Sequence, residues 1–287
     1  MPVEKDASGR RYVQAEVEVP GTPEEVWAAI ATGPGVSSWF VPSEIEERTG
    51  GAAISHFSPD GSMDSVATIT AWEPPHRFTA DSRDDMGPDD PTIATEWIVE
   101  ARAGGACVVR VVHSWFTDSD AWDGQFEGHV YGWLSFFRVL RLYLAHFSGQ
   151  PCTIVQMMGV APEPKEAAWA TLTGPLGLGG AVVGQRVSTP DGAPPLAGVV
   201  EWAGQPAWPE ELLVRLDQPA PGIVHMVPHP MMGQVYVTLR FFLYGEGAAG
   251  AAQHVETLWQ AWLNQRFTPV GSESENDSVT PIATEVG

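Results

Sequence analysis

Apolar and polar residues alternate in residues 12–19 in the way that a half-buried strand requires. One face of this segment carries Val13, Ala15, Val17 and Val19, and the other face carries polar side chains. The same period of two recurs between Gly, Pro and Asp breakers. It predicts further strands at 51–57, 65–72, 77–82, 93–101 and 107–116.

Helical patterns stand at two places in this first half. Thr22, Pro23 and Glu25 form the signature of a capped helix start, with proline in the first turn and a capping box. From 125 to 147 the period becomes helical, and Phe126 and Val130 lead into an apolar seam. The seam consists of Trp133, Phe137, Leu140, Leu144 and Phe147.

The second half repeats this order. PEEVWAAIATGP (23–34) returns as PKEAAWATLTGP (164–175), and both copies follow an apolar extended run. A helix is predicted at 164–173 and a longer one at 251–266. The strands predicted around them are 152–159, 181–188, 197–203, 210–217, 222–227 and 234–244. An internal repeat of this length indicates a duplicated domain.

The order of elements predicts an α+β fold of two tandem helix-grip domains, each a curved antiparallel sheet wrapped around a long C-terminal helix. We place the domains at 10–149 and 150–267, followed by a disordered tail at 268–287 that is rich in Ser, Thr and Glu. Only four residues, 148–151, join the predicted long helix to the next strand. They span at most about 14 Å, so we expect the halves to pack directly.

Composition excludes some partners and places. The net charge of −21 makes nucleic acid and anionic membranes poor partners. No apolar run is long enough to span a membrane, and the N-terminus lacks the apolar segment of a secretory signal, so we expect a cytoplasmic location. Cys107 and Cys152 form no metal or redox motif, and we interpret both as small buried hydrophobic residues.

Several segments of the first half resemble one known superfamily. They are PEEVWAAI (23–30), the pair Trp39-Phe40, ITAWEPPHRF (69–78), TEWIVEARAGGACVVRVVHSWF (95–116) and GWLSFFRVLRLYL (132–144). Together they resemble the START, or Bet v 1-like (SRPBCC), superfamily, in the branch related to activator of Hsp90 ATPase homologues. The second half resembles it more faintly, through P-x-E, a Trp and the V-V-E-W segment at 199–202, and has GLGG in place of the Trp-Phe pair.

The resemblance implies binding of an apolar small molecule between the sheet and the long helix. Tandem START-like proteins also resemble products of actinobacterial polyketide and enediyne antibiotic clusters. The leading hypothesis is therefore a non-catalytic protein that binds an elongated polyketide- or polyene-like molecule in biosynthesis or self-resistance. A cyclase or aromatase is the alternative, and a co-chaperone, whose protein partner the sequence does not name, is the third.

Strand parity selects the residues of the predicted site. If Arg110 faces outward, Val111, His113 and Trp115 face the helix, and the same argument turns Trp97 inward. With Trp133 and Phe137 these residues form the first-half wall, and Trp259 and Trp262 are the expected second-half contributors to an elongated cavity. His113 is the candidate general base, because imidazole titrates near neutral pH. The alternative interpretation of His113 is a hydrogen-bonded core residue, and the aromatic stripe likewise reads as core unless a cavity exists.

The sequence offers no convincing metal or cofactor site, and we expect neither. His225 and His229 lie in HMVPHP, where Pro228 and Pro230 exclude a helix and no acidic or cysteine partner is close in sequence. A structural role is preferred over a metal site there. The acidic loops 81–90 and 117–124 lack calcium-loop spacing. Arg138 and Arg141 are expected to face solvent or the other half, and one of them could instead meet a ligand carboxylate.

Overall fold

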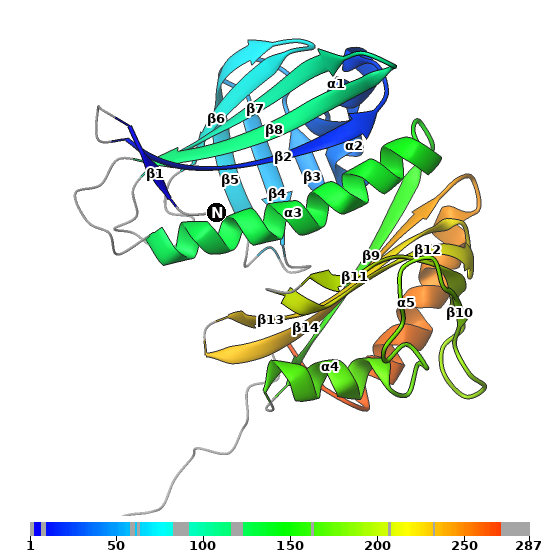
Figure 1. Ribbon diagram of the computed structural model, residues 1–287. Coiled ribbons are helices and arrows are strands. Elements are labelled where there is room, and N and C mark those ends of the chain that lie inside the picture. The colour runs from blue at the N-terminus through cyan, green and yellow to red at the C-terminus, as the bar shows by residue number, and fades with distance from the viewer. Residues whose placement is uncertain are drawn as a thin grey trace, which may run out of the picture.

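The chain forms two antiparallel sheets, each accompanied by helices (Figure 1). This is a computed structural model, and it describes residues 3–6, 10–57, 61, 64–82, 92–115, 123–161, 164–205, 208–231 and 233–270, with side chains not described at 123–131 and 231. The first sheet contains β1 (Glu4–Lys5), β2 (Arg11–Pro20), β3 (Ser43–Ile45), β4 (Ala52–His56), β5 (Asp64–Glu73), β6 (Arg77–Ser82), β7 (Ile93–Arg102) and β8 (Ala106–Trp115). Its helices are α1 (Pro23–Ala31), α2 (Gly33–Ser37) and α3 (Asp123–His146).

The second sheet is built in the same way. Its strands are β9 (Cys152–Ala161), β10 (Arg186–Ser188), β11 (Ala197–Gln205), β12 (Trp208–Gln218), β13 (Gly222–Met231), β14 (Gln234–Tyr244) and β15 (Thr268–Pro269). Its helices are α4 (Lys165–Thr173) and α5 (Ala248–Asn264). The boundary at 149/150 stays a prediction, and it falls between α3 and β9.

The strand order confirms that the two halves share one topology. The first sheet runs β1-β2-β8-β7-β6-β5-β4-β3, and the second runs β10-β11-β12-β13-β14-β9-β15. Read from the strand that opens each half, the shared part is β2-β8-β7-β6-β5-β4 in one and β9-β14-β13-β12-β11-β10 in the other. A short helix follows the first strand and a long helix follows the last meander strand in both. The predicted α+β class of tandem helix-grip domains is therefore confirmed.

Two strands differ in length from the sequence prediction. The strand predicted at 181–188 shrinks to β10, because Val182 and Val183 are more than half exposed and Gly184 has a positive φ of 83°. The strand predicted at 222–227 extends to Met231. The last residues of this strand pair only with β14. Pro228 and Pro230 have no N–H to donate, and they lie where no second strand needs a hydrogen bond from them.

The tail prediction is wrong at its start. Thr268 and Pro269 form a short strand paired with β9. The rest of the predicted tail, from Gly271, lies outside the described residues. The acidic segments 83–91 and 116–122 also lie outside them, as do the side chains of Phe126 and Val130.

The predicted helix start at Thr22 is present. The Thr22 Oγ1 accepts from the Glu25 amide at 3.3 Å, and the Glu25 carboxylate accepts from the Thr22 amide at 2.8 Å. This reciprocal pair satisfies two amides that the first turn leaves without helical partners. The cap fixes α1 against the inner face of the first sheet, where Val26 and Ile30 are buried.

Helix α3 lies between the two sheets (Figure 1). The predicted seam faces the first sheet, and its residues Phe137, Leu140, Leu144 and Phe147 are buried. A second stripe, which the sequence reading missed, includes Val139 and Tyr143. The second sheet contributes four buried residues to the same core, namely Leu213, Ile223, Phe242 and Tyr244. The opposite face of that sheet packs on α4 and α5 in a separate core. Direct packing of the halves is therefore confirmed.

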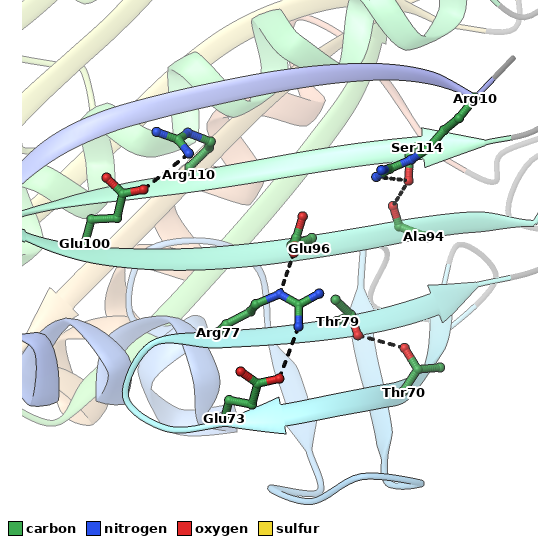
Figure 2. A network of polar contacts seen from close by, with 10 residues as sticks. All are labelled: Arg10, Thr70, Glu73, Arg77, Thr79, Ala94, Glu96, Glu100, Arg110 and Ser114. Atoms are coloured by element: carbon green, nitrogen blue, oxygen red, sulfur yellow. Dashed lines mark hydrogen bonds and ion pairs between the residues drawn. The ribbon is translucent and has the colours of Figure 1, made fainter. Parts of the chain in front are cut away.

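The outer face of the first sheet carries the polar partners that strand parity predicted (Figure 2). Arg77 Nε donates to Glu96 at 2.5 Å and its Nη1 to Glu73 at 3.1 Å. Arg110 donates to Glu16 and Glu100, at 3.1 and 3.4 Å. Because these ion pairs are partly exposed, each adds little stability. Together they mark this face as the solvent-facing one, so the residues between them point inward.

Of the two cysteines predicted to be buried, Cys107 is buried and Cys152 is only partly buried. Cys107 is fully buried, and burial raises the pKa of its thiol. Burial also raises the pKa of Cys152 to about 12. Neither forms a disulfide. Among the described helices, none is long and apolar enough to cross a membrane.

The junction of the halves can be tested at Tyr244. Its buried hydroxyl donates to the Ser38 carbonyl at 2.7 Å across the junction, and its ring stacks on Phe147 at 4.2 Å. We expect Tyr244→Phe to lower the free energy of unfolding by about 1–2 kcal/mol, because the Ser38 carbonyl loses its donor. Urea denaturation measures this. Tyr236→Phe, at a partly exposed ring, is the control, and equal stability of all three proteins would contradict the assignment.

Candidate functional site

The predicted aromatic wall of the first half is assembled around Trp133. The Trp133 ring lies 5.0 Å from Trp97, 5.1 Å from Phe40 and 5.9 Å from Phe137, measured between ring centroids. Trp97 comes from β7, Phe40 follows α2, and the other two come from α3. Inward-facing strand positions and the α3 seam thus converge as the alternation predicts. Sequence reasoning missed Phe40 as a member, although it had singled out the Trp39-Phe40 pair.

His113 is held by two partners at the edge of this cluster. Its Nδ1 lies 2.9 Å from Thr95 Oγ1, and Trp133 Nε1 donates to its Nε2 in a short hydrogen bond. The Trp133 ring also stacks on the imidazole, with centroids 5.6 Å apart. Because indole N–H is only a donor, Nε2 is the acceptor, and the proton of neutral His113 sits on Nδ1. In this arrangement Nε2 is occupied and cannot take a substrate proton unless Trp133 moves.

The remaining predicted residues fall into two separate places. Val111 and Trp115 are fully buried in the core of the first half, beside the cluster. Trp259 and Trp262 are buried in the other core, where Trp259 packs on Phe241 at 5.1 Å. The second sheet stands between the two cores, so the structure does not bring these two tryptophans to the first-half wall. The elongated cavity expected to be lined by both sets is not formed by these residues.

A hollow lies on the outer face of the first sheet, away from this chemistry. It is lined by Val66, Thr68, Thr70 and Asp81 of β5 and β6. Its walls are Val66 and three short polar side chains on a solvated face, with no aromatic ring among them. We therefore place the candidate site at the aromatic cluster.

A second concentration of polar groups lies where α3 meets the second sheet. Glu211, whose side chain is fully buried, accepts from Arg138 at 3.3 Å and from Trp202 Nε1 at 2.8 Å. Its other oxygen lies 3.1 Å from His225 Nε2. The Arg138 guanidinium stacks over the Trp202 ring at 3.8 Å. Arg138 thus meets a carboxylate of the other half, and Arg141 is exposed, as the sequence predicted.

The charge states of this cluster follow from burial and pairing. Burial raises the pKa of Glu211, but the hydrogen bonds and charges of His225, Ser135 and Arg138 outweigh it and leave the pKa lowered. Burial lowers the pKa of His225 despite Glu211. Glu211 is therefore ionised near neutral pH and His225 is neutral, with its proton on Nε2 facing the carboxylate. Burial alone lowers the pKa of Arg240 to about 10.

His225 has an acidic partner that does not lie close to it in sequence. Glu211 of β12 supplies it, brought alongside by the pairing of Leu213 with His225. The antiparallel register of β12 and β13 sets this contact, and sequence spacing alone does not reveal it. Within the described residues, no group of three or more His, Cys, Asp or Glu side chains could hold a metal ion.

Fold and site define a tandem α+β protein whose first half encloses an aromatic cluster between sheet and helix. Residues 10–140 match the family described as "Polyketide cyclase / dehydrase and lipid transport". This match confirms the resemblance predicted for the first half from its sequence. The match covers that half and does not extend to the second. No curated protein sequence matches the chain significantly.

Solved structures similar to this chain include two that span both halves. DynU16, from the dynemicin biosynthetic locus, is 16% identical over 88% of this chain and 95% of its own, with a TM-score of 0.40. BexL, a di-domain ARO/CYC from the BE-7585A biosynthetic pathway, is 13% identical over 90% and 95%, with a TM-score of 0.43. CalU16 from Micromonospora echinospora is 16% identical over 50% and 83%, with a TM-score of 0.39.

The polar cluster predicts how stability depends on pH. Burial, with smaller contributions from the charges of Arg240 and His225, lowers the pKa of His229 to about 4. Because the unfolded chain binds this proton near pH 6.5 and the folded chain does not, stability falls as pH drops through that window. We expect His229 to contribute a loss of about 1–2 kcal/mol between about pH 7 and pH 5, which His229→Gln removes while the contribution of His225 remains. Urea titrations at both pH values measure it.

The control for this prediction is His254→Gln, which changes an exposed histidine on α5. This variant should keep the pH dependence of the wild type. A His229→Gln protein with an unchanged pH dependence would show that His229 is not held neutral.

Proposed function

We propose that this protein binds an elongated, apolar polyketide- or polyene-like molecule against the aromatic cluster between the first sheet and α3. The role is that of a binding protein in antibiotic biosynthesis or self-resistance, without chemistry of its own. The site consists of Trp97, Val111, His113, Trp115, Trp133 and Phe137, together with Phe40. The partner is a hydrophobic small molecule, and the net charge of −21 opposes nucleic acid.

The observation that carries this proposal is the unbroken series of aromatic contacts centred on Trp133. It extends from Phe78, stacked on Trp97 at 6.2 Å, through Trp133 to Phe40 and on to Phe136, which lies 4.4 Å from Phe40. A row of flat rings offers several successive stacking surfaces to a long conjugated molecule. His113 and Thr95 add one polar contact to an otherwise apolar wall, which is the composition typical of small-molecule sites.

The family match supports the same class of ligand. Its description joins polyketide cyclases with lipid transport, and both activities require a large apolar molecule to be held in the fold. Trp133 is half-buried, whereas Phe137 behind it is fully buried. A ring at this depth can contact a ligand without unfolding the core.

We expect Trp133→Ala to weaken binding of all-trans-retinol, a neutral conjugated polyene, by about tenfold or more, because it removes the central stacking surface. Energy transfer from tryptophan to the polyene measures binding. Trp133→Phe, which keeps a ring, should bind more tightly than Trp133→Ala. Trp169→Ala, at a partly buried position of α4, controls for the loss of one fluorophore, and equal binding by all four proteins would refute the proposal.

The second candidate function is a cyclase or aromatase with His113 as general base. One observation favours it: Thr95 orients the imidazole, so that Nε2 would become a base once Trp133 moved away from it. This function differs from binding in needing turnover.

A linear poly-β-ketone thioester distinguishes the two functions. A cyclase would convert it, lose turnover in His113→Gln, and keep or gain turnover in Trp133→Phe, which removes the competing donor to Nε2. Under the binding proposal, we expect no cyclised product from the wild type by mass spectrometry. Product formation that depends on His113 would replace the binding proposal with the cyclase.

A further inference from the structure

A buried arginine at the junction of the halves has no counter-ion within the described residues. Arg240 of β14 is 7% exposed and faces α3, where its guanidinium lies 5.2 Å from the centre of the Phe136 ring. Its Nε donates to Gln156 at 2.8 Å, and no described carboxylate lies within ion-pair distance of it. The neighbouring Arg138 differs, because Glu211 neutralises it.

Two polar atoms on residues beside Arg240 are buried without a hydrogen-bond partner. They are Nδ1 of His225 and Oγ1 of Thr238, on side chains that are 2% and 0% exposed. His225 is the cross-strand partner of Arg240, and Thr238 lies two residues before Arg240 on the same face of β14. The His225 ring also packs on Phe136, at 6.1 Å between centroids. Arg240 and His225 therefore both contact one ring of α3, and Thr238 lies beside Arg240 on the face of β14 that α3 covers.

Buried polar groups in native proteins are nearly always paired, so each orphan calls for an explanation. A buried cation is costlier still to leave without an anion. The charges of Arg138, Arg240 and Glu211 leave the cluster with one net positive charge, in a chain whose net charge is −21. A local excess of positive charge in so acidic a protein indicates a place for one negative charge.

We propose that Arg240, His225 and Thr238 form a binding site for a carboxylate group of a small molecule at the junction of the two halves. The planar guanidinium of Arg240 matches a carboxylate through two parallel hydrogen bonds. The Thr238 hydroxyl donates a further one. Phe136 supplies a flat apolar wall, so the ligand class is a carboxylic acid with an aromatic or apolar body.

The chemistry of the three groups favours a carboxylate over a metal or a phosphate. The guanidinium repels a cation and can only donate hydrogen bonds. A single uncompensated positive charge suits a single negative charge better than the two of a phosphate. The three polar groups lie on the second sheet, and the site shares only Phe136 with the aromatic series of the first-half cluster. The proposal rests on the polar groups and does not depend on the ligand proposed for that cluster.

Binding at this site should be coupled to a proton. Neutral His225 keeps its proton on Nε2 toward Glu211, so its Nδ1 can donate to the carboxylate only after a second proton is bound. The charged and titratable groups around the ring are Glu211 of β12, Arg240 of β14, Arg138 of α3 and His229 of β13 itself. The positive charges of Arg138 and Arg240 disfavour protonation of His225, and the negative charge of a bound carboxylate offsets them.

The test measures the binding of two probes, 4-fluorobenzoate and the neutral 4-fluorobenzamide, to the full chain by fluorine NMR. We expect the benzoate to bind and the benzamide to bind at least about tenfold more weakly. Arg240→Met should lose the benzoate and leave the benzamide unchanged. Arg215→Met is the matched control, because Arg215 lies in the same sheet but is paired with Glu201 at 2.7 Å, and it should bind the benzoate as the wild type does.

A second readout separates binding from a structural role. Benzoate affinity of the wild type should fall as pH rises from about 6 to 8, and His225→Gln, whose amide can still donate to Glu211, should lose that dependence. If Arg240→Met does not fold, Arg240→Lys keeps the charge without the fork and should bind the benzoate more weakly than the wild type. Equal binding of both probes to the wild type, or equal benzoate binding by wild type and Arg240→Met, would overturn the proposal.

Discussion

The architecture depends on one helix that covers apolar residues of two sheets. Helix α3 closes the first sheet with its predicted seam, as any helix of this fold does, but its other side is covered by Leu213, Ile223, Phe242 and Tyr244 of the second half. The second sheet is consequently covered on both faces, by α3 on one and by α4 and α5 on the other. Since burial of apolar surface is the main favourable contribution to folding, the two halves share their stability instead of adding two independent amounts.

This sharing explains why charges are buried at the junction. This face of the second sheet carries polar as well as apolar side chains. In an isolated domain it would meet water, but here it packs on α3. Glu211 resolves the conflict for Arg138, Trp202 and His225 by accepting a hydrogen bond from each. Networks of this kind are costly when one member lacks a partner and specific when all members are satisfied. The junction contains both cases, since Glu211 accepts from three donors, whereas His225 Nδ1 has no partner and Arg240 has no described counter-ion.

The sequence predicted most of the fold because its signals are local. Alternation defined β6 and β14 to the residue, the repeat predicted the shared topology, and parity turned Val111, His113 and Trp115 inward. The site was predictable only on the first sheet, where inward residues and the helix seam belong to one familiar pattern. Glu211, His225 and Arg240 were not predictable as a group, because each reads alone as a solvent-facing residue and only strand pairing with α3 above it brings them together. The aromatic residues Phe242 and Tyr244, on the same face of β14 as Arg240, are the one signal that this face is covered.

The position of α3 also constrains how the chain acquires its structure during synthesis. All strands of the first sheet and α3 itself are made before residue 150, but the residues that cover the second stripe of α3 lie between Leu213 and Tyr244. An early-folding first half would therefore hold Val139, Tyr143 and their neighbours uncovered while about a hundred further residues are translated, at roughly 5–20 residues per second. For those seconds the nascent chain displays an apolar stripe of the kind that chaperones bind.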